Sequence, residues 1–106
     1  MRPANTTQAQ QKMLQLLGNR IPGRRTTKVK EHRERAKHIA DTLYRHFQVG
    51  PYQYRLKHLL WYLNTHIQPL QAATQYRHWL TARQVVIALE RWQHWQPRLV
   101  GSWMRP

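Results

Sequence analysis

Residues 28–47 read KVKEHRERAKHIADTLYRHF, and this stretch decides the fold of the chain. Its apolar residues recur three or four positions apart, which places them on one face of an α-helix. Thr27 is a suitable N-cap residue, and Glu31 and Glu34 lie toward the helix end that carries partial positive charge. The stretch therefore predicts a long amphipathic helix. Its packing face consists of Val29, Ala36, Ile39, Ala40, Leu43, Tyr44 and Phe47.

A shorter helix is expected before this stretch, over residues 7–17. Thr6 or Thr7 can cap its N-terminus, and Gly18 just after its end is a suitable C-terminal cap. Residues 19–27 carry several basic side chains and few apolar ones that could anchor them. We therefore expect a flexible basic arm between the first two helices.

Two more helices follow the long one. The third is expected to begin near Pro51, a residue well suited to the first helical position, and to end before Pro69. The fourth is expected to run from its N-cap Thr74 to about Trp95, and its broad apolar arc predicts the most buried helix of the fold. The expected apolar residues are Leu56, Leu59, Leu60, Leu63 and Ile67 in the third helix, and Tyr76, Trp79, Leu80, Val86, Ile87, Leu89 and Trp92 in the fourth.

The remaining tail is too short and too rich in helix breakers for another helix. Leu99, Val100 and Trp103 can nevertheless fold back on the bundle. For Trp103 two roles remain open, packing on the bundle and contact with a partner. We predict an all-α protein, a single small bundle of about four helices with a basic N-terminal arm and a Trp-containing C-terminal tail. Residues 1–27 form the first helix and the arm, and residues 28–106 form the main helical domain.

The net charge of the chain narrows the range of possible functions. The chain has 18 Lys and Arg against four Asp and Glu, a formal net charge of +14 in 106 residues. Self-repulsion of this size is commonly relieved by a polyanion, so nucleic acid is the leading partner. The simpler interpretation, that the charge only keeps the chain in solution, is weaker because acidic residues serve solubility better. Basic residues interleaved with aromatic and amide side chains also suit contacts with phosphates and base edges.

The composition excludes several classes of site. The chain has no Cys, so disulfides and thiolate metal sites cannot form. The longest apolar runs, residues 59–63 and 85–89, are far shorter than the roughly 20 residues of a membrane-spanning helix. We expect no membrane partner. The first 30 residues contain no acid, as in mitochondrial presequences, but they lack the apolar core of a secretory signal.

Catalysis is not expected either. The four carboxylates, Glu31, Glu34, Asp41 and Glu90, are expected to act as helix-dipole partners and in intrahelical ion pairs with neighbours such as Arg35. None of the seven histidines lies three or four residues from another, the spacing that a helical metal site favours. We therefore expect no enzyme, no cofactor and no metal site. Some histidines are expected to protonate beside phosphate, so that binding tightens as the pH falls.

Residues 28–92 of the chain resemble one known protein family in the order of their helices. A long helix is followed by a Leu-rich helix containing Tyr62-Leu63, a short break, and the segment ATQYRHWLTAR, residues 73–83, which opens the last helix. This order resembles the helical core-binding domain of phage-type tyrosine recombinases. The resemblance implies binding of duplex DNA through Arg77, Arg83 and the helix over residues 28–47. The chain leaves no room for the catalytic domain of that family, so recombinase activity is not expected.

We therefore expect a non-enzymatic nucleic-acid-binding protein, a duplex DNA-binding accessory or regulatory factor, with nucleic acid bound mainly by residues 28–106. It would act in the bacterial cytoplasm or on the nucleoid, or belong to a mobile element, with a mitochondrial location as the alternative. An RNA-bound component of a ribonucleoprotein and a basic inhibitor that docks an acidic protein remain alternative functions, and DNA is favoured over RNA. The expected binding residues are Arg20, Arg24, Arg25, Lys28, Lys30, Arg33, Lys37, Arg77 and Arg83.

Overall fold

The computed structural model describes residues 2–18, 20 and 27–105. Within these residues it contains five α-helices and no strand, which confirms the all-α prediction. Short helical turns connect them: η1, η3 and η4 are single 3₁₀ turns, and η2 is a π-helical turn that continues α3. In chain order the elements are α1 (Thr6–Leu17), α2 (Thr27–Phe47), η1 (Pro51–Gln53), α3 (Leu56–Trp61), η2 (Tyr62–His66), α4 (Ala72–Ala88), α5 (Trp92–Trp95), η3 (Gln96–Arg98) and η4 (Ser102–Met104).

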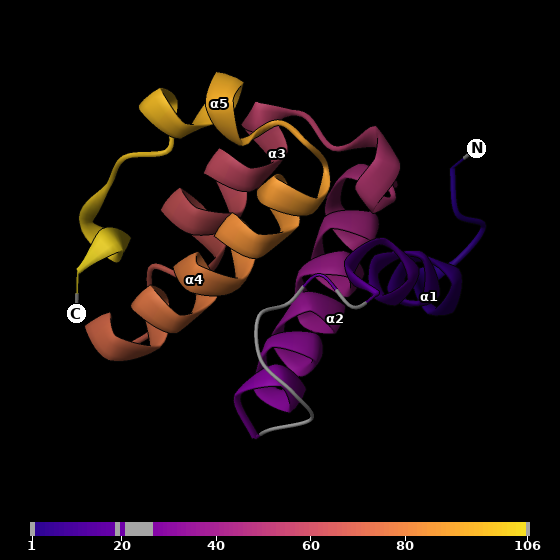
Figure 1. The fold of residues 1–106 in the computed structure, drawn as a ribbon, viewed down its shortest axis with the longest axis horizontal. Coiled ribbons are helices and arrows are strands. Elements are labelled where there is room, and N and C mark those ends of the chain that lie inside the picture. The colour runs from indigo at the N-terminus through magenta and orange to yellow at the C-terminus, as the bar shows by residue number, and fades with distance from the viewer. Residues whose placement is uncertain (1, 19, 21–26, 106) are drawn as a thin grey trace.

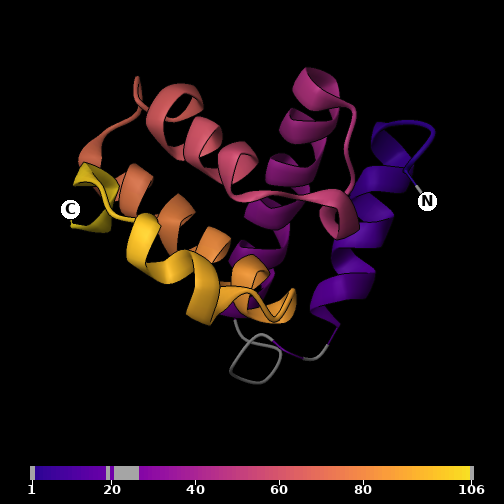
Figure 2. The same ribbon diagram turned by 90° about the horizontal axis from the view of Figure 1, so that it is seen from above.

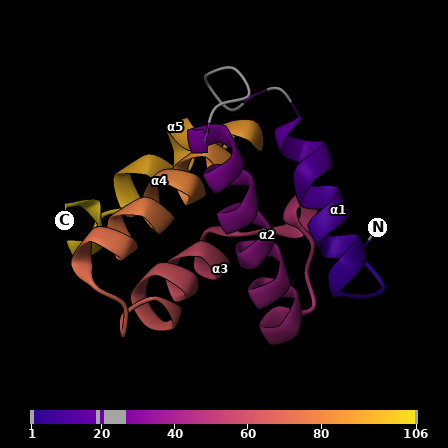
Figure 3. The same cartoon turned by 90° about the horizontal axis from the view of Figure 1, so that it is seen from below.

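The helices pack around α2, which lies between α1 on one side and α3 and α4 on the other (Figures 1 and 3). α4 contacts α1, α2, α5, η2 and η4, so it is a central element of the bundle, as predicted. The tail from α5 to η4 runs beside α4 (Figure 2). The bundle measures 34 × 31 × 27 Å, and its two termini lie at opposite ends.

The apolar face of α2 forms the middle of the core. Ala36, Ile39, Ala40 and Leu43 are completely buried, as the spacing predicts. The other helices bury apolar side chains against the same core, so one continuous cluster extends from α1 to the tail. Its largest fully buried side chains outside α2 are Met13, Leu17, Leu59, Tyr62, Leu63, Ile67, Val85, Val86, Leu99 and Trp103.

The N-terminus of α1 is capped by Asn5, not by Thr6 or Thr7. The Asn5 side-chain oxygen accepts a hydrogen bond of 2.8 Å from the backbone N–H of Gln8, which satisfies one of the free donors of the first turn. Gly18 ends the helix as predicted, with φ of 45°. Glycine is favoured there because it has no Cβ to oppose a left-handed backbone.

The third helix begins later than predicted. Pro51 opens the η1 turn, and the extended backbone of Tyr54 and Arg55 then separates this turn from α3. After Trp61 the chain widens into a π-helical turn, in which the N–H of Ile67 donates to the carbonyl of Tyr62 at 3.1 Å. Of the predicted apolar stripe, Leu59, Leu63 and Ile67 are fully buried, whereas Leu56 and Leu60 are half-buried.

The fourth helix ends earlier than predicted, at Ala88 instead of Trp95. Glu90 adopts a left-handed φ of 60°, its N–H donates to Ile87, and the N–H of Arg91 donates to Val86. These two hydrogen bonds form a Schellman motif, which usually has glycine at the left-handed position. Ile87, in the last turn of α4, is 44% exposed, so the prediction that it belongs to the core is wrong.

The tail folds back on the bundle as predicted. Leu99 and Trp103 are almost fully buried, whereas Val100 is exposed. A Cβ on Gly101 would overlap the Trp103 ring, so this glycine allows the indole to fold over the backbone. Trp103 therefore serves packing, which settles the alternative left open by the sequence.

Replacing Trp79 with Ala should lower the free energy of unfolding by about 3 to 5 kcal/mol, because a buried indole is lost from the core. Ile87→Ala is the matched comparison on the same helix, and it should cost less than about 1 kcal/mol because its side chain is exposed. Urea unfolding of both variants measures the difference. Equal losses would contradict the described end of α4.

Replacing Glu90 with Gly should raise the free energy of unfolding by about 0.5 to 1 kcal/mol, because glycine adopts the left-handed backbone without strain. Glu90→Ala removes the same carboxylate but keeps the Cβ, so it should not stabilise the protein. Thermal melts of the two variants distinguish backbone strain from charge. A gain of the same size with Ala would assign the effect to the carboxylate.

Candidate nucleic-acid interface

The predicted binding residues do not form one continuous group. Arg24 and Arg25 lie outside the described residues, so their role stays a prediction. Lys28 and Lys30 are exposed on the first turn of α2. Two further members of the set on α2 contact other parts of the protein: a guanidinium nitrogen of Arg33 lies 3.4 Å from the Gly18 carbonyl, and the Lys37 Nζ lies 3.8 Å from the Glu34 carboxylate.

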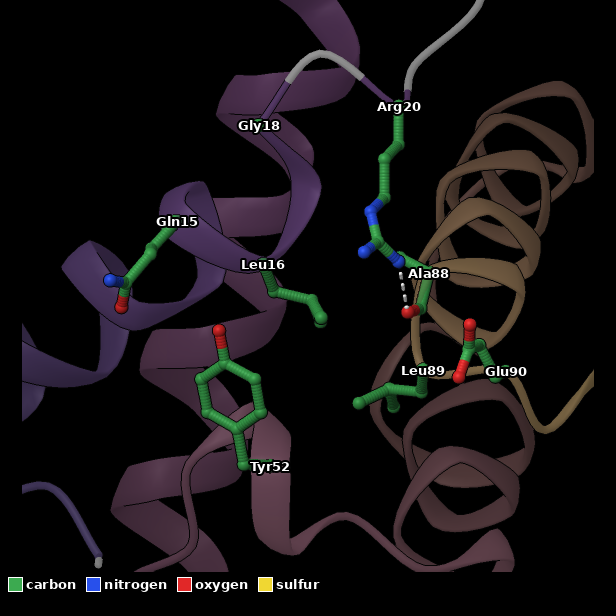
Figure 4. Close-up of a pocket in the computed structure, with 8 residues that line it drawn as sticks. All are labelled: Gln15, Leu16, Gly18, Arg20, Tyr52, Ala88, Leu89 and Glu90. Carbon is green, nitrogen blue, oxygen red and sulfur yellow. Dashed lines mark hydrogen bonds between the residues drawn. The ribbon is translucent and has the colours of Figure 1, made fainter.

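Arg20 is held against the bundle. Its guanidinium donates a hydrogen bond of 2.7 Å to the carbonyl of Ala88, the last residue of α4 (Figure 4). A cation is favoured at this position because the C-terminal carbonyls of a helix carry partial negative charge. The contact borders a pocket of about 350 Å³, and Figure 4 shows the Tyr52 ring on the opposite side of it from the Glu90 carboxylate. Arg20 thus joins the chain after α1 to the end of α4.

The buried hydroxyl of Thr81 connects α2 and α4. The Arg35 Nε donates to the Thr81 Oγ1 at 2.9 Å, and the His32 Nδ1 lies 2.9 Å from the same oxygen. The hydroxyl also lies 3.3 Å from the carbonyl of Arg77, one turn earlier on α4. Since the oxygen already accepts from Arg35, its own proton is free to be donated to the imidazole or to that carbonyl.

Four basic side chains gather around this contact: His32 and Arg35 from α2, and Arg77 and Arg83 from α4. We call them the α2–α4 cationic cluster. Arg77 is exposed, and the other three are half-buried. The Arg83 Nε is buried without a hydrogen-bond partner among the described residues. Neither of the two ion pairs formed by described residues involves a member of the cluster.

The pKa values show that the arginines act on one another and on His32, whose imidazole is uncharged at neutral pH. Burial lowers the pKa of His32, and the positive charges of Arg35 and Arg83 lower it further against the opposing effect of Glu31. Burial also lowers the pKa of the Arg35 guanidinium, and Arg77 adds to this effect while Glu31 opposes it. The α2–α4 cationic cluster therefore carries positive charge that the nearby carboxylate does not fully compensate.

Half of this cluster was not predicted from the sequence. Arg35 was expected to pair with acidic neighbours on α2, and this is wrong, because the side chain reaches across to Thr81. His32 was not among the predicted binding residues. The intrahelical ion pairs themselves are confirmed for Glu34 with Lys37 and for Asp41 with Arg45.

Four other histidines also meet, although they are distant in sequence. The His38 Nε2 and the His66 Nε2 are 3.2 Å apart, and His78 Nδ1 lies 2.8 Å from the buried Tyr62 hydroxyl. His46 stacks on Trp61 with ring centroids 3.9 Å apart. Even so, the described part of the chain has no group of three or more His, Asp or Glu that could hold a metal ion.

This histidine group is electrostatically coupled to the α2–α4 cationic cluster. Burial lowers the pKa of His78 to about 4, with further contributions from His38, Arg35 and His66. Burial also lowers the pKa of His66, and His38 and His46 lower it further. At neutral pH both rings are therefore uncharged, and the folded protein resists their protonation.

These shifts predict that the protein loses stability in acid. A histidine whose folded pKa is below its unfolded value of 6.5 stabilises the native state above that value, and this contribution is lost as the pH falls toward the folded pKa. The free energy of unfolding should therefore fall between pH 7 and pH 4. His78→Gln should reduce this fall by about 2 kcal/mol, because the variant lacks the buried imidazole that acid protonates.

Urea unfolding at a series of pH values measures this dependence. His94→Gln is the control, because His94 is exposed on α5. If the His78 variant shows the wild-type slope between pH 7 and pH 4, the neutral buried imidazole is not the origin of the acid sensitivity.

No helix among the described residues is long and apolar enough to cross a membrane. Comparisons of the chain with protein-family models, with curated proteins and with solved structures find no match.

Proposed function

We propose that this chain is a non-enzymatic nucleic-acid-binding protein, and that it binds duplex DNA through the α2–α4 cationic cluster. The observation that carries the proposal is that three arginines and a histidine meet around Thr81 with only partial compensation by Glu31. Bringing like charges together costs free energy in the unbound protein. Phosphate oxygens would remove that cost by accepting hydrogen bonds from the guanidinium groups.

The fixed geometry of the cluster favours a rigid ligand surface. Arg35 and His32 are held by the Thr81 hydroxyl, so they lose little conformational freedom when a phosphate arrives. Arg77 is exposed, and it has no side-chain hydrogen bond or ion pair with any described residue. Arg83 is half-buried, and its Nε is shielded from solvent, so a ligand would contact this residue only through the exposed part of its side chain. The free guanidinium of Arg77 suits the oxygens of a regular phosphate backbone.

Exposed lysines extend the proposed surface along α2. Lys28 and Lys30 lie on the first turn of α2, and Lys37 is half-buried beyond His32. The resemblance to the core-binding domain of tyrosine recombinases also implies that α2 and α4 face the DNA. This role of the two helices stays a prediction. An accessory factor of this type would act in the bacterial cytoplasm or on the nucleoid.

Binding to duplex DNA should weaken steeply with salt. With about four or five phosphate contacts, the logarithm of the binding constant should fall with the logarithm of the salt concentration with a slope near −4. Arg77→Gln and Arg83→Gln should each reduce the magnitude of this slope by about 1. Arg91→Gln removes the same charge from an exposed position after α4 and should affect the slope little. Fluorescence anisotropy at several salt concentrations measures these slopes.

Duplex RNA and an acidic protein of matched charge are the competing ligands in the same titration. Tighter binding of RNA would favour the ribonucleoprotein alternative, and tighter binding of the acidic protein would favour a basic inhibitor. A slope near zero on both nucleic acids would reject the proposal.

A further inference from the structure

A second basic surface lies on the side of α2 where that helix ends. Here the structure has a pocket of about 580 Å³, between the N-terminal segment, the end of α2 and the η1–α3 connection. Its volume is within the range of pockets that hold small molecules. The pocket is lined by Arg2, Phe47, Tyr52, Arg55, Lys57 and His58, among others, and no Asp or Glu occurs among its described lining residues.

Three cations converge on this pocket. His58 is buried beneath it, and burial lowers the pKa of this imidazole, with further contributions from Lys57, Arg55 and Arg2. Each of the three charges is therefore close enough to act on the same ring. All three side chains are exposed, and none takes part in either ion pair formed by described residues. The pocket is thus a site of positive charge with room for an anion.

The pocket floor is rigid and aromatic. The Nδ1 of His58 accepts a hydrogen bond of 2.9 Å from the backbone N–H of Arg55, so this nitrogen is the unprotonated one. The His58 ring packs against Phe47 with centroids 4.7 Å apart. Tyr52 at the edge of the pocket is 52% exposed, which leaves much of its ring free. The site therefore offers an aromatic surface next to the three cations.

The position of Arg2 depends on a glycine. Pro3 is buried, and a Cβ added to Gly50 would lie 2.6 Å from the Pro3 Cγ, closer than two carbons can approach. Only glycine lets the N-terminal segment pack so closely on the connection after α2. The close packing of Pro3 on Gly50 therefore places the neighbouring Arg2 in the lining of the pocket.

We propose that this pocket binds a phosphorylated nucleoside unit. The phosphate would be bound by Arg2, Arg55 and Lys57, and the base would stack on Tyr52. The unit is either a free nucleotide or one nucleotide of a single strand. This inference goes beyond the proposed function, because the pocket is separate from the α2–α4 cationic cluster and its ligand is tested without a duplex.

The test is isothermal titration of the whole protein with AMP, adenosine and inorganic phosphate. AMP should bind about tenfold more tightly than either of its parts, because charge and stacking act together. Arg55→Gln and Lys57→Gln should each weaken AMP binding several-fold, and Tyr52→Ala should reduce it to the level of inorganic phosphate. Arg98→Gln, an exposed cation in the tail, is the control and should leave AMP binding unchanged.

Gly50→Ala tests the site without removing any charge. It should weaken AMP binding by displacing Pro3 and Arg2, with thermal melts to show that the variant is folded. If it does not fold, Arg2→Gln tests the same residue and should weaken binding similarly. A short single-stranded oligonucleotide distinguishes the two sources of the ligand: binding of the strand but not of AMP, with the same variant losses, supports the single-strand form of the site.

The inference is overturned if inorganic phosphate binds as tightly as AMP and Tyr52→Ala has no effect, or if neither AMP nor the single strand binds. These results are independent of duplex binding. A protein that binds AMP but shows no salt-dependent affinity for duplex DNA would reject the proposed function and keep the pocket. A protein that binds the duplex but neither AMP nor the single strand would do the reverse.

Discussion

The arrangement of this bundle depends on the contact between α2 and α4, and at its centre is one hydroxyl group. Thr81 is almost fully buried, and its oxygen contacts both Arg35 and His32 across the helix interface. A buried hydroxyl is costly unless it is hydrogen-bonded, and here it accepts from a cation, which gives one of the stronger bonds available. The contact fixes how the two helices face each other, and it brings their basic side chains together.

Apolar packing makes this concentration of charge tolerable. The core of small and branched side chains on α2 is continuous with the aromatic and aliphatic groups of η2, α4 and the tail. Its burial supplies the main favourable free energy of folding, and the repulsion among the half-buried cations reduces the net stability. The same cations are available to a ligand because the protein offers them few carboxylates. Stability and binding capacity are therefore linked through one set of side chains.

The sequence predicted those features that depend on local periodicity. The buried face of α2 followed from its spacing, and the end of α1 followed from Gly18, because both are properties of neighbouring residues. The end of α4 could not be predicted, because the left-handed position of its cap is occupied by Glu90 instead of glycine. The π-helical turn after Trp61 could not be predicted either, since nothing in the local sequence pattern distinguishes it from a regular helix.

The candidate site was predicted only in part for a related reason. Arg77 and Arg83 were expected as binding residues from the resemblance, but their proximity to Arg35 and His32 depends on how two distant helices cross. The meeting of His38 with His66 is likewise tertiary, since 28 residues separate them. The basic pocket was not predicted either, because Arg2 reaches it only through the packing of Pro3 on Gly50. Such contacts have no signature within a short window of sequence.

The fold of the tail has a consequence for how the protein is made. Trp103 belongs to η4, which packs against α4, and both Trp103 and the buried Leu99 follow all five helices in the sequence. Before this segment packs, the side of α4 that η4 contacts is exposed, and such apolar surfaces promote aggregation. Completion of the core is therefore expected to wait for residues 99–104, so the bundle should close as a unit after synthesis of this segment instead of growing helix by helix.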